Sequence, residues 1–392
     1  MKILMLAPEP FFQPRGTPIS VYFRIKALAD LGHEIHLITY PLGGHVDLKN
    51  FKAFRIPNLF PIRSIKIGPS LAKIPLDSLL FLKAFSILVR NRYDLIFSHE
   101  EAALFGAILG KLFSVPHIYD MHSSLPQQLD NFKFSRSRVL KSLFLLMENY
   151  ILKSSQAVIV ICQDLMELVR KKGHGQKVIL IENFIDFNDF EKQTFSESEL
   201  QQKKSELAPH GEKIFLYAGN FESYQGVPLL LEAAAKLKEK AVFLLVGGNP
   251  PEIEKMKKMA DSLRIKDRVI FIRKVPPAQV PVYLSLADVL VSPRLSGTNT
   301  PLKIYSFLKS GKPLVATNLW THTQVLSRKI SILVEPNPES FAEGMALAIS
   351  SPEAQARACA AKDLSQKEYT YPRYLERMEE CIKNATVRFH HL

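Results

Sequence analysis

The sequence predicts two doubly wound α/β domains, each Rossmann-like and built on a parallel β-sheet. Short apolar runs alternate with helix-like segments along the chain, and they form two successive series. A polar stretch over residues 187–211, rich in Glu, Lys, Gln and Ser, separates the series and indicates a linker. The chain has 392 residues, of which 47% are hydrophobic, and this suffices for two packed cores.

The strand candidates lack clean polar alternation, as expected for strands that helices cover on both faces. In the first series they are Lys2 to Ala7, Glu34 to Tyr40, Phe51 to Ile56, Asp94 to His99, His117 to His122, Ala157 to Cys162 and Val178 to Glu182. In the second they are Lys213 to Gly219, Ala241 to Gly247, Arg268 to Arg273, Asp288 to Arg294, Pro313 to Thr317 and Ile330 to Glu335. We expect domains over residues 1–190 and 191–370, and a charged tail, 371–392, that packs back on the first domain or stands alone.

The cysteines and the apolar runs indicate a cytoplasmic protein without a membrane span. Cys162, Cys359 and Cys381 are too few for a disulfide framework and lack metal-ligand spacing, so we expect a reducing compartment and no metal site. No signal peptide is apparent, and no run of about 20 apolar residues occurs. Lys83 interrupts the best candidate, residues 78–89.

A formal net charge of +13 favours anionic partners such as nucleotide phosphates, anionic lipid or nucleic acid. Residues 51–93 carry about eight Lys or Arg against Asp77 alone, interleaved with apolar side chains. This segment forms either ordinary helices with solvated faces or a surface that rests on the inner face of a membrane. The basic residues form no nucleic-acid reader motif, so we expect no nucleic-acid partner.

Open α/β sheets bind ligands beyond the carboxyl ends of their strands, so the loops there are the places to search. After the first strand, Thr17 is a suitable N-cap and Pro18 a suitable first helical residue. Gly16 is either a turn glycine or a point where the backbone approaches a ligand at the helix end. The loop lacks the G-x-G-x-x-G dinucleotide pattern, so a nicotinamide enzyme is disfavoured and we expect no cofactor.

Two strands of the first series end in histidine, at His99-Glu100 and at His122-Ser123. A lone histidine is usually structural. Two in equivalent places suggest side chains that donate to a sugar hydroxyl or to a developing charge near neutral pH. No Ser or Cys nucleophile elbow accompanies them.

The second series contains the sharpest signal, at the start of the helix after residues 289–294. Thr300 and Pro301 predict the helix start, so Lys303 falls in the first turn, where a cation opposes the helix dipole. An anion docked there would resolve the conflict, with Lys303 and backbone N–H groups holding a diphosphate; otherwise Lys303 points into solvent. The loops that start at Gly219 and Gly247 also link strands to helices.

With these residues the chain resembles the GT-B glycosyltransferases, specifically retaining family 4, over nearly its whole length. The similar segments are Gly16 with Leu31 to Ile35, Asn183 to Asp186, Leu245 to Gly248, Arg268 to Phe271, Ala287 to Pro293 and Lys303 to Val315. The resemblance implies two domains that face a cleft with a nucleotide-sugar site.

The chain departs from the family pattern at three places. The segments Asn220 to Gly226, Ser292 to Pro301 and Thr321 to Leu326 resemble a variant bacterial subgroup that lacks the usual donor-site Glu pair. Ser306 stands where family members carry the Glu that holds the ribose, and residues 296–299 lack the Glu that meets the donor sugar. Asn220 and Gln225 replace the usual Arg and Lys of the diphosphate site. Arg294 and Lys303 are the replacement cations that we expect.

The resemblance implies transfer of a sugar from a nucleoside diphosphate sugar to a glycan or lipid-linked acceptor, with retention, without metal, in cell-envelope or surface polysaccharide synthesis. The expected catalytic residues are His122, Lys303 and Arg294. The expected donor site contains Gly219, Asn220, Tyr224, Gln225, Gly247, Thr298, Asn299, Thr300 and Ser306, and the expected acceptor site contains Gly16, Thr17, His99, Glu100 and Ser123. The departures leave open an inactive binding or scaffold protein with the same fold.

Overall fold

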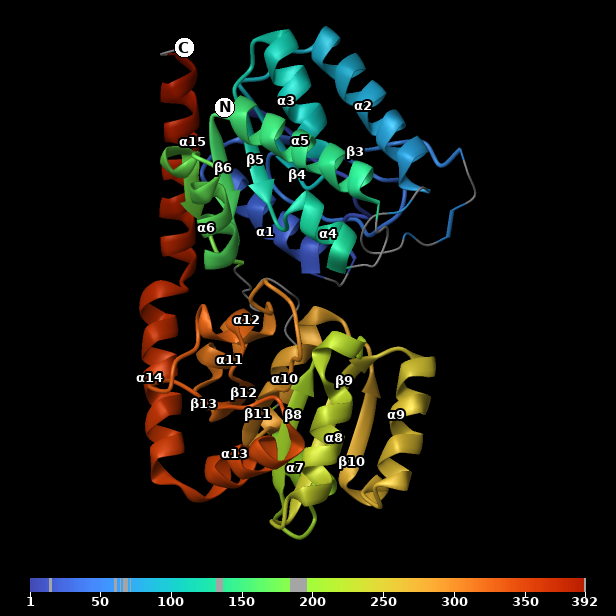
Figure 1. Cartoon of the computed structure of the whole chain (residues 1–392), viewed down its shortest axis with the longest axis vertical. Helices are drawn as coiled ribbons and strands as arrows, with labels where there is room; N and C mark the ends of the chain where they lie inside the picture. Colours follow the sequence, from blue (N-terminus) through green and yellow to red (C-terminus); the bar gives the residue numbers. More distant parts are fainter. Residues whose placement is uncertain are drawn as a thin grey trace. The chain divides into compact units, whose positions relative to one another are not determined.

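The computed structural model describes residues 1–13, 16–59, 62–63, 65, 70, 72–131, 137–183 and 196–390, and these form two compact units (Figure 1). Unit 1 comprises Met1–Phe184 together with Tyr371–Leu392, and unit 2 comprises Ile185–Thr370. The C-terminal helix is therefore part of the first unit.

Unit 1 is built on a seven-stranded sheet in the order β3-β2-β1-β4-β5-β6-β7, with every neighbouring pair parallel. The strands are β1 (Lys2–Ala7), β2 (Glu34–Thr39), β3 (Phe51–Arg55), β4 (Leu95–His99), β5 (His117–Met121), β6 (Ala157–Val160) and β7 (Val178–Leu180). All seven predicted strands are confirmed, with ends that differ by at most two residues. The parallel sheet that the alternation of strands and helices predicts is thus confirmed for this unit.

Helices cover both faces of this sheet. They are α1 (Gly16–Asp30), α2 (Lys73–Arg90), α3 (Ala102–Phe113), α4 (Leu125–Asn131), α5 (Arg138–Ser154), α6 (Gln163–Lys171), η1 (Gly175–Lys177) and α15 (Tyr371–His390). Tyr119 and Met121 of β5 join the core that α5 and α6 form on one face. Asp120, between them, contacts Arg24 of α1 on the other face, where α1 also packs against α15.

Unit 2 is built on a six-stranded sheet in the order β10-β9-β8-β11-β12-β13, again entirely parallel. The strands are β8 (Lys213–Ala218), β9 (Ala241–Gly248), β10 (Val269–Arg273), β11 (Val289–Ser292), β12 (Leu314–Thr317) and β13 (Ile332–Val334), so all six predictions are confirmed. The helices are α7 (Glu197–Leu207), η3 (Ser223–Gln225), α8 (Val227–Lys236), α9 (Pro250–Ser262), η4 (Lys266–Arg268), η5 (Pro277–Gln279), α10 (Val280–Leu286), α11 (Lys303–Ser310), α12 (Trp320–Thr323), α13 (Pro338–Ser350) and α14 (Pro352–Glu368).

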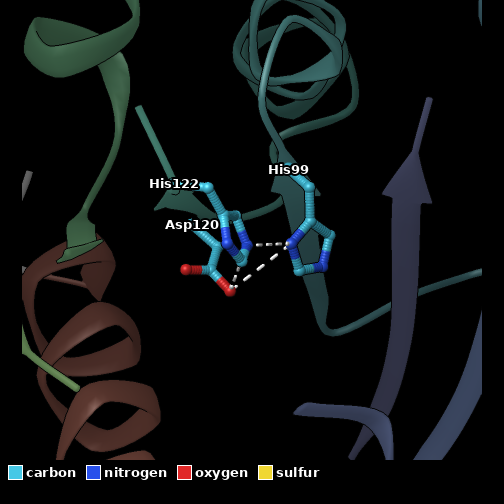
Figure 2. Close-up of side chains that lie close together, drawn as sticks. All are labelled: His99, Asp120 and His122. Carbon is cyan, nitrogen blue, oxygen red and sulfur yellow. Dashed lines mark hydrogen bonds and ion pairs between the residues drawn. The ribbon is translucent and has the colours of Figure 1, made fainter. Parts of the chain in front are cut away.

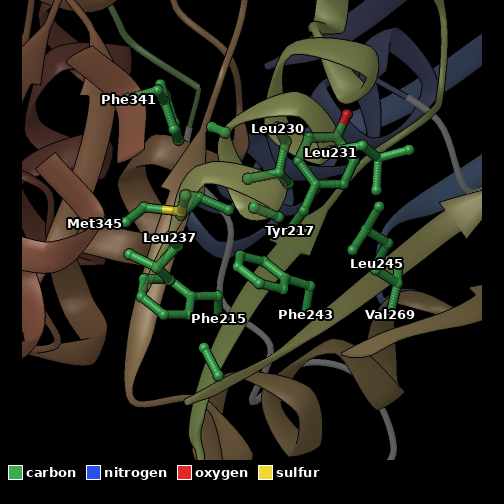
Figure 3. Close-up of a cluster of buried hydrophobic side chains, with 14 of the residues drawn as sticks. Phe215, Tyr217, Leu230, Leu231, Leu237, Phe243, Leu245, Val269, Phe341 and Met345 are labelled. Carbon is green, nitrogen blue, oxygen red and sulfur yellow. The ribbon is translucent and has the colours of Figure 1, made fainter. Parts of the chain in front are cut away.

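The core of unit 2 lies between this sheet and the helices that cover it (Figure 3). Phe215 of β8 stacks on Phe243 of β9 with ring centroids 5.2 Å apart. Phe341 and Met345 of α13 extend the same cluster, and all four side chains are inaccessible to water. Each such side chain contributes about 1.5–3 kcal/mol through its burial, which holds the sheet and its loops in place.

Three local predictions were wrong. Residues 197–207, expected within a linker, form α7, which starts with a capping box of Ser196 and Glu199; because it buries no residue, its apolar periodicity is weak. Helix α1 begins at Gly16, so Thr17 is not its N-cap. Helix α11 begins at Lys303 with Leu302 in the N-cap position, so Thr300 does not cap it. In the described part of the chain, no helix has the length and apolar character needed to cross a membrane.

Candidate functional site

Polar side chains collect at the carboxyl edge of the unit 1 sheet because two neighbouring parallel strands end there together. In the register of β4 and β5, His99 lies opposite Asp120. His122 follows two residues later and returns to the same side of the chain as Asp120, since side chains alternate along an extended backbone. The sequence thus brings two imidazoles and one carboxylate to one place.

Figure 2 shows these three side chains in mutual contact. Oδ2 of Asp120 lies 3.4 Å from Nδ1 of His99 and 3.5 Å from Nε2 of His122. The same two imidazole nitrogens are 3.2 Å apart. All three residues are buried, so their interactions are shielded from water and are correspondingly strong.

Arg24 of α1 supplies the positive charge that balances Asp120. Its Nε donates to Asp120 Oδ2 over 2.9 Å, and neither side chain is accessible to solvent. Its remaining N–H groups donate to Tyr374 Oη over 2.8 Å and to the Ile181 carbonyl over 2.9 Å. One guanidinium therefore joins α1, β5, the segment after β7 and α15.

Burial and the charges of this network together shift the pKa values of the two histidines. Burial opposes ionisation of Asp120, but the guanidinium of Arg24 holds the pKa of its carboxyl below the usual range. Burial lowers the pKa of His99 to about 3, so His99 is neutral. Burial would also lower the pKa of His122, but the carboxylates of Asp120 and Glu100 outweigh it and raise that pKa. Of the two histidines, His122 is the one whose pKa is raised, so it accepts a proton more readily than His99 does.

Two histidines and an aspartate are also a donor set that transition metals favour, and their ligand atoms lie within 4.8 Å of one another. Arg24, however, already binds the aspartate oxygen that both histidines approach. A metal cation would have to share that oxygen with a fixed guanidinium charge, and the two cations would repel each other. The arrangement fits a hydrogen-bonded charge network better than a metal centre.

Glu100 lies beside this network in a left-handed backbone conformation, φ +48°. Its carboxylate accepts hydrogen bonds from Ser123 Oγ over 3.0 Å and from Gln128 Nε2 over 2.8 Å. Burial, reinforced by the charge of Glu101, raises the pKa of Glu100 to about 7. Glu100 and Ser123 therefore lie together with His99 and His122, as the sequence predicted for residues that follow neighbouring strands.

Gly16 and Thr17 form the first turn of α1, with Gly16 exposed and Thr17 half-buried. A Cβ added to Gly16 would meet no heavy atom within 4 Å, so the space beside this backbone is open. The structure records no hydrogen bond from Gly16 or Thr17 to the histidine network among the described residues, and their assignment to an acceptor site stays a prediction.

In unit 2, the loops after β8 and β11 meet backbone to backbone. The Leu295 N–H donates to the Tyr224 carbonyl over 2.8 Å. Gly226 has φ +73°, and a Cβ there would lie 1.8 Å from the Pro293 carbonyl oxygen. Only glycine permits this close contact, which places Tyr224 and Gln225 beside the residues that follow β11.

The loop after β8 and the carboxyl end of β9 also approach each other closely. A Cβ added to Gly247 would lie 2.3 Å from the Gly219 carbonyl oxygen, and one added to Gly219 would lie 3.2 Å from Lys303 Nζ. Asn220, also expected here, is exposed, and its carbonyl oxygen accepts the hydroxyl of Tyr217. These predicted donor-site residues therefore do lie around the same strand ends.

Lys303 and Arg294 bring two positive charges to these strand ends. Nζ of Lys303 lies 4.0 Å from the centroid of the Tyr217 ring and 3.4 Å from Oε1 of Gln225. The guanidinium of Arg294 lies 5.2 Å from the centroid of the Tyr224 ring. Burial lowers the pKa of Lys303 well below its usual value and also lowers that of Arg294.

No carboxylate of the described residues pairs with Lys303 or with Arg294. Their polar partners are neutral, namely Gln225 for Lys303 and the Ser296 carbonyl for Arg294. Partly desolvated cations without a counter-ion are unfavourable, and an anionic ligand would remove that penalty. A ligand with negative charge would therefore fit this edge of unit 2.

The residues between Arg294 and α11 are held by α12. Gln324 Nε2 donates to the Thr298 carbonyl and Thr321 Oγ1 donates to the Asn299 carbonyl, each over 2.6 Å. Among the described residues, the buried hydroxyl of Thr300 has no partner. Ser306 donates its hydroxyl to the Lys303 carbonyl over 2.9 Å, so it is occupied within its own helix.

Sequence reasoning missed four residues of these networks: Arg24, Asp120, Tyr217 and Tyr374. Two of them left a signal. Arg24 falls on the apolar side of α1, one turn before Leu28, and a charge on a buried helix face requires a buried partner. Asp120 stands two residues before His122 in a strand, so the two share a side.

Comparison with known protein families matches almost the whole chain in two parts. The family described as "Glycosyltransferase Family 4" matches residues 14–189, and the family described as "Glycosyl transferases group 1" matches residues 198–362. The chain is 24% identical over 356 residues to an uncharacterized glycosyltransferase of Methanocaldococcus jannaschii, which covers 88% of each chain. It is 26% identical over 327 residues to the alpha-monoglucosyldiacylglycerol synthase of Streptococcus pneumoniae, covering 81% of this chain and 71% of the relative.

A similar arrangement occurs in solved structures. The sucrose-phosphate synthase of Thermosynechococcus elongatus matches with a TM-score of 0.80 at 19% identity, covering 97% of this chain and 98% of that one. HepE of Anabaena, in complex with UDP, matches with a TM-score of 0.76 at 18% identity, covering 98% and 100%. The GT-B fold predicted from the sequence is thus confirmed.

The burial of the Arg24–Asp120 pair predicts how substitutions there change the free energy of unfolding. Arg24→Met leaves an uncompensated buried carboxylate and should lower the free energy of unfolding by about 3–5 kcal/mol. The double variant Arg24→Met/Asp120→Leu should recover much of that loss, because no charge is stranded. Denaturant unfolding followed by circular dichroism measures both effects, with the fluorescence of Trp320, the single tryptophan, reporting unit 2 separately.

Lys26→Met is the matched control on the same helix. Lys26 forms an i,i+4 pair with Asp30, and a pair of that kind contributes less than about 1 kcal/mol. If Arg24→Met were no more harmful than Lys26→Met, or if the double variant recovered nothing, the network would not have the assigned role.

The raised pKa of Glu100 predicts a pH dependence. The folded state retains this proton up to about pH 7, whereas the unfolded chain releases it near pH 4.5. The stabilisation by the bound proton is therefore lost as the pH rises through this interval. Glu100→Gln lacks the titration, so its melting temperature relative to wild type should increase from pH 4.5 to pH 7 in thermal scans. The exposed Glu254→Gln serves as control; a constant difference for Glu100→Gln would refute the assignment.

Proposed function

Because the chain belongs to the GT-B glycosyltransferases of the family 4 type, we propose that it transfers a sugar from a nucleoside diphosphate sugar to a glycan or lipid-linked acceptor. The observation that carries this proposal is the pair of cations, Lys303 and Arg294, that lie at the strand ends of unit 2 without a carboxylate partner in the described chain. A diphosphate supplies the missing negative charge. Solved relatives of the same fold in complex with UDP and with UDP-glucose support this class of ligand.

In this proposal, unit 2 stabilises the leaving group. Negative charge develops on the diphosphate as the sugar departs, and Lys303, at the first position of α11, lies where the helix dipole also favours an anion. Arg294 is fixed against the Tyr224 ring and therefore needs little reorganisation at the moment of reaction. Thr300, with its unpartnered buried hydroxyl, offers a further hydrogen bond to the donor.

Unit 1 contributes the acceptor side of the proposed reaction. His122, with its raised pKa, would exchange a proton with the acceptor, and Glu100 with Ser123 offers a carboxyl and a hydroxyl for sugar hydroxyl groups. Gly16 and Thr17, at the open first turn of α1, complete the proposed acceptor site. Arg24 and Asp120 keep the charge of His122 in balance, so they act through it as positioning residues.

We further propose that the reaction proceeds with retention, without a metal ion and without a cofactor. Retention rests on the resemblance to family 4. A metal ion is unnecessary in this scheme because Lys303 and Arg294 supply the charge that a divalent cation would give to a diphosphate.

The acceptor that we favour is lipid-linked, with a role in the cell envelope and a position on the cytoplasmic face of a membrane. Two relatives support this choice. They are the alpha-monoglucosyldiacylglycerol synthase named above and a phosphatidyl-myo-inositol mannosyltransferase of Mycolicibacterium smegmatis, which is 23% identical over 361 residues. The formal charge of +13 also suits an anionic surface.

Nucleotide binding tests the donor site. We expect titration with UDP, GDP and ADP to show saturable binding of one of them. The titration is monitored by calorimetry and by the fluorescence of Trp320, which begins α12 beside the donor loop. Lys303→Ala should weaken this binding by about 10- to 100-fold, since a hydrogen bond to a charged group is lost. Lys309→Ala, an exposed lysine of the same helix, is the control and should bind as wild type does. Absence of binding to all three nucleotides in the folded protein would refute the proposal.

The stereochemical course and the metal requirement can be read from one assay of product formation. Proton NMR of the first product should show the anomeric configuration of the donor sugar, because the proposed transfer retains it. An excess of EDTA should leave the initial rate unchanged, since the diphosphate charge is met by protein cations. An inverted product, or a rate that falls with EDTA and returns with Mg²⁺, would overturn these two parts of the proposal.

A further inference from the structure

Unit 1 carries an unusual concentration of exposed apolar side chains. Of eighteen large hydrophobic residues that are exposed in the described chain, eleven belong to three helices, α2, α3 and α5. They are Ile74, Leu82, Phe85 and Val89 of α2, Ile108 and Leu112 of α3, and Val139, Leu143, Leu145, Leu146 and Tyr150 of α5. Scattered apolar residues on a surface need no explanation, but a cluster of this size does.

These residues form stripes on the outward sides of their helices. In α5, Val139, Leu143, Leu146 and Tyr150 follow one another at steps of four and three residues, which places them on one side, whereas Ile151 and Leu152 are buried in the core. The side of a helix that faces away from the core is ordinarily polar. Here both sides are apolar.

The same inversion occurs in α2. Its inward side buries Leu76, Leu80, Ala84 and Leu88. Its outward side carries Ile74, Leu82, Phe85 and Val89, again at helical spacing. Two such helices in one unit indicate a surface that is covered by something apolar.

The three helices are neighbours, so their stripes make one surface, which we call the α2–α3–α5 face (Figure 1). Phe81 of α2 meets Phe105 of α3 with ring centroids 5.4 Å apart, and Phe85 meets Phe113 at 5.6 Å. Helices α3 and α5 also pack against each other. All three belong to unit 1, so this surface does not depend on the placement of unit 2.

The charges on the α2–α3–α5 face have one sign. Exposed basic residues of these helices include Arg90, Lys111, Arg138 and Lys153. The helices contain two carboxylates, and neither is exposed: Asp77 accepts the Tyr40 hydroxyl, and Glu148 is buried beside Lys172. An apolar surface with basic side chains around it matches the boundary between headgroups and acyl chains of an anionic bilayer.

We propose that the α2–α3–α5 face binds the surface of an anionic lipid bilayer. Leu82, Leu143 and Leu146 would enter the boundary between headgroups and acyl chains, while the lysine and arginine stems extend outward to lipid phosphates. The inference deepens the proposed function and rests on it for the lipid-linked acceptor. The contacts that define the face come from unit 1 alone.

Charge argues for lipid rather than for a second copy of the chain. In a symmetric dimer through this face, the same surface of two copies would meet, and their basic residues would face each other without exposed carboxylates from these helices. An anionic bilayer instead offers negative charge to every basic residue at once.

The test is co-sedimentation of the full chain with vesicles of phosphatidylglycerol and phosphatidylcholine, compared with vesicles of phosphatidylcholine alone. Binding should require the anionic lipid and should weaken as salt is raised. Leu143→Glu/Leu146→Glu and Leu82→Glu/Val89→Glu should each reduce partitioning at least about tenfold, since each inserts two charges into the bound surface. The matched control is Leu347→Glu/Val387→Glu, at two residues that are 41% and 47% exposed outside this face.

Nucleotide titration of the same variants separates this inference from the proposed function. Variants that bind nucleotide as wild type does but have lost vesicle binding support the inference. Equal binding to neutral and anionic vesicles, or face variants that sediment as the control does, would overturn it. A concentration-dependent dimer, measured by light scattering, would also overturn it if Leu143→Glu/Leu146→Glu abolished the dimer and neither the wild type nor this variant bound vesicles. Vesicle binding without nucleotide binding would leave the inference standing and would remove the proposed donor.

Discussion

Taking a charged pair out of water is costly, and unit 1 does so at Arg24 and Asp120, two side chains without any solvent exposure. The cost is met by saturating the guanidinium with Asp120, Tyr374 and the Ile181 carbonyl. Several elements around the histidine network meet at this one group. Helix α1, the end of β5, the segment after β7 and α15 converge on it. The carboxylate that it holds ionised raises the pKa of His122, whereas burial lowers the pKa of His99.

The two units handle charge in opposite ways. In unit 1 the positive and negative groups are matched within the protein, although Asp120 Oδ1 and His99 Nε2 have no hydrogen-bond partner among the described residues. In unit 2, Lys303 and Arg294 are held against tyrosine rings and neutral oxygens. Such cations gain little from the protein and much from a diphosphate. Gly226 and Gly247 allow the close backbone contacts at these strand ends, because a Cβ at either position would lie 2.3 Å or less from a carbonyl oxygen.

The sequence predicted the sheets well because parallel strands covered on both faces are continuous apolar runs, and all thirteen were located. It also predicted which loops lie near one another, since parallel strands place their carboxyl ends at one edge of a sheet. The sequence did not predict the features whose cause lies outside the local residue pattern. Helix α7 buries nothing and so carries no apolar stripe. Tyr374 meets Arg24 across 350 positions, a contact that no spacing rule anticipates. The helix start at Lys303 follows loop packing against α12 rather than the capping preference of Thr300.

Unit 1 is discontinuous in sequence, since residues 371–392 return to it after the whole of unit 2 has been made. During synthesis on the ribosome, the chain therefore emerges in an order that does not match the order in which its parts can be completed. Unit 2 can bury its core as soon as its own residues have appeared. The polar network of unit 1, by contrast, waits for Tyr374. Until then Arg24 lacks one of its partners and the surface that α15 will cover stands open, so nascent unit 1 stays incomplete for longer than unit 2.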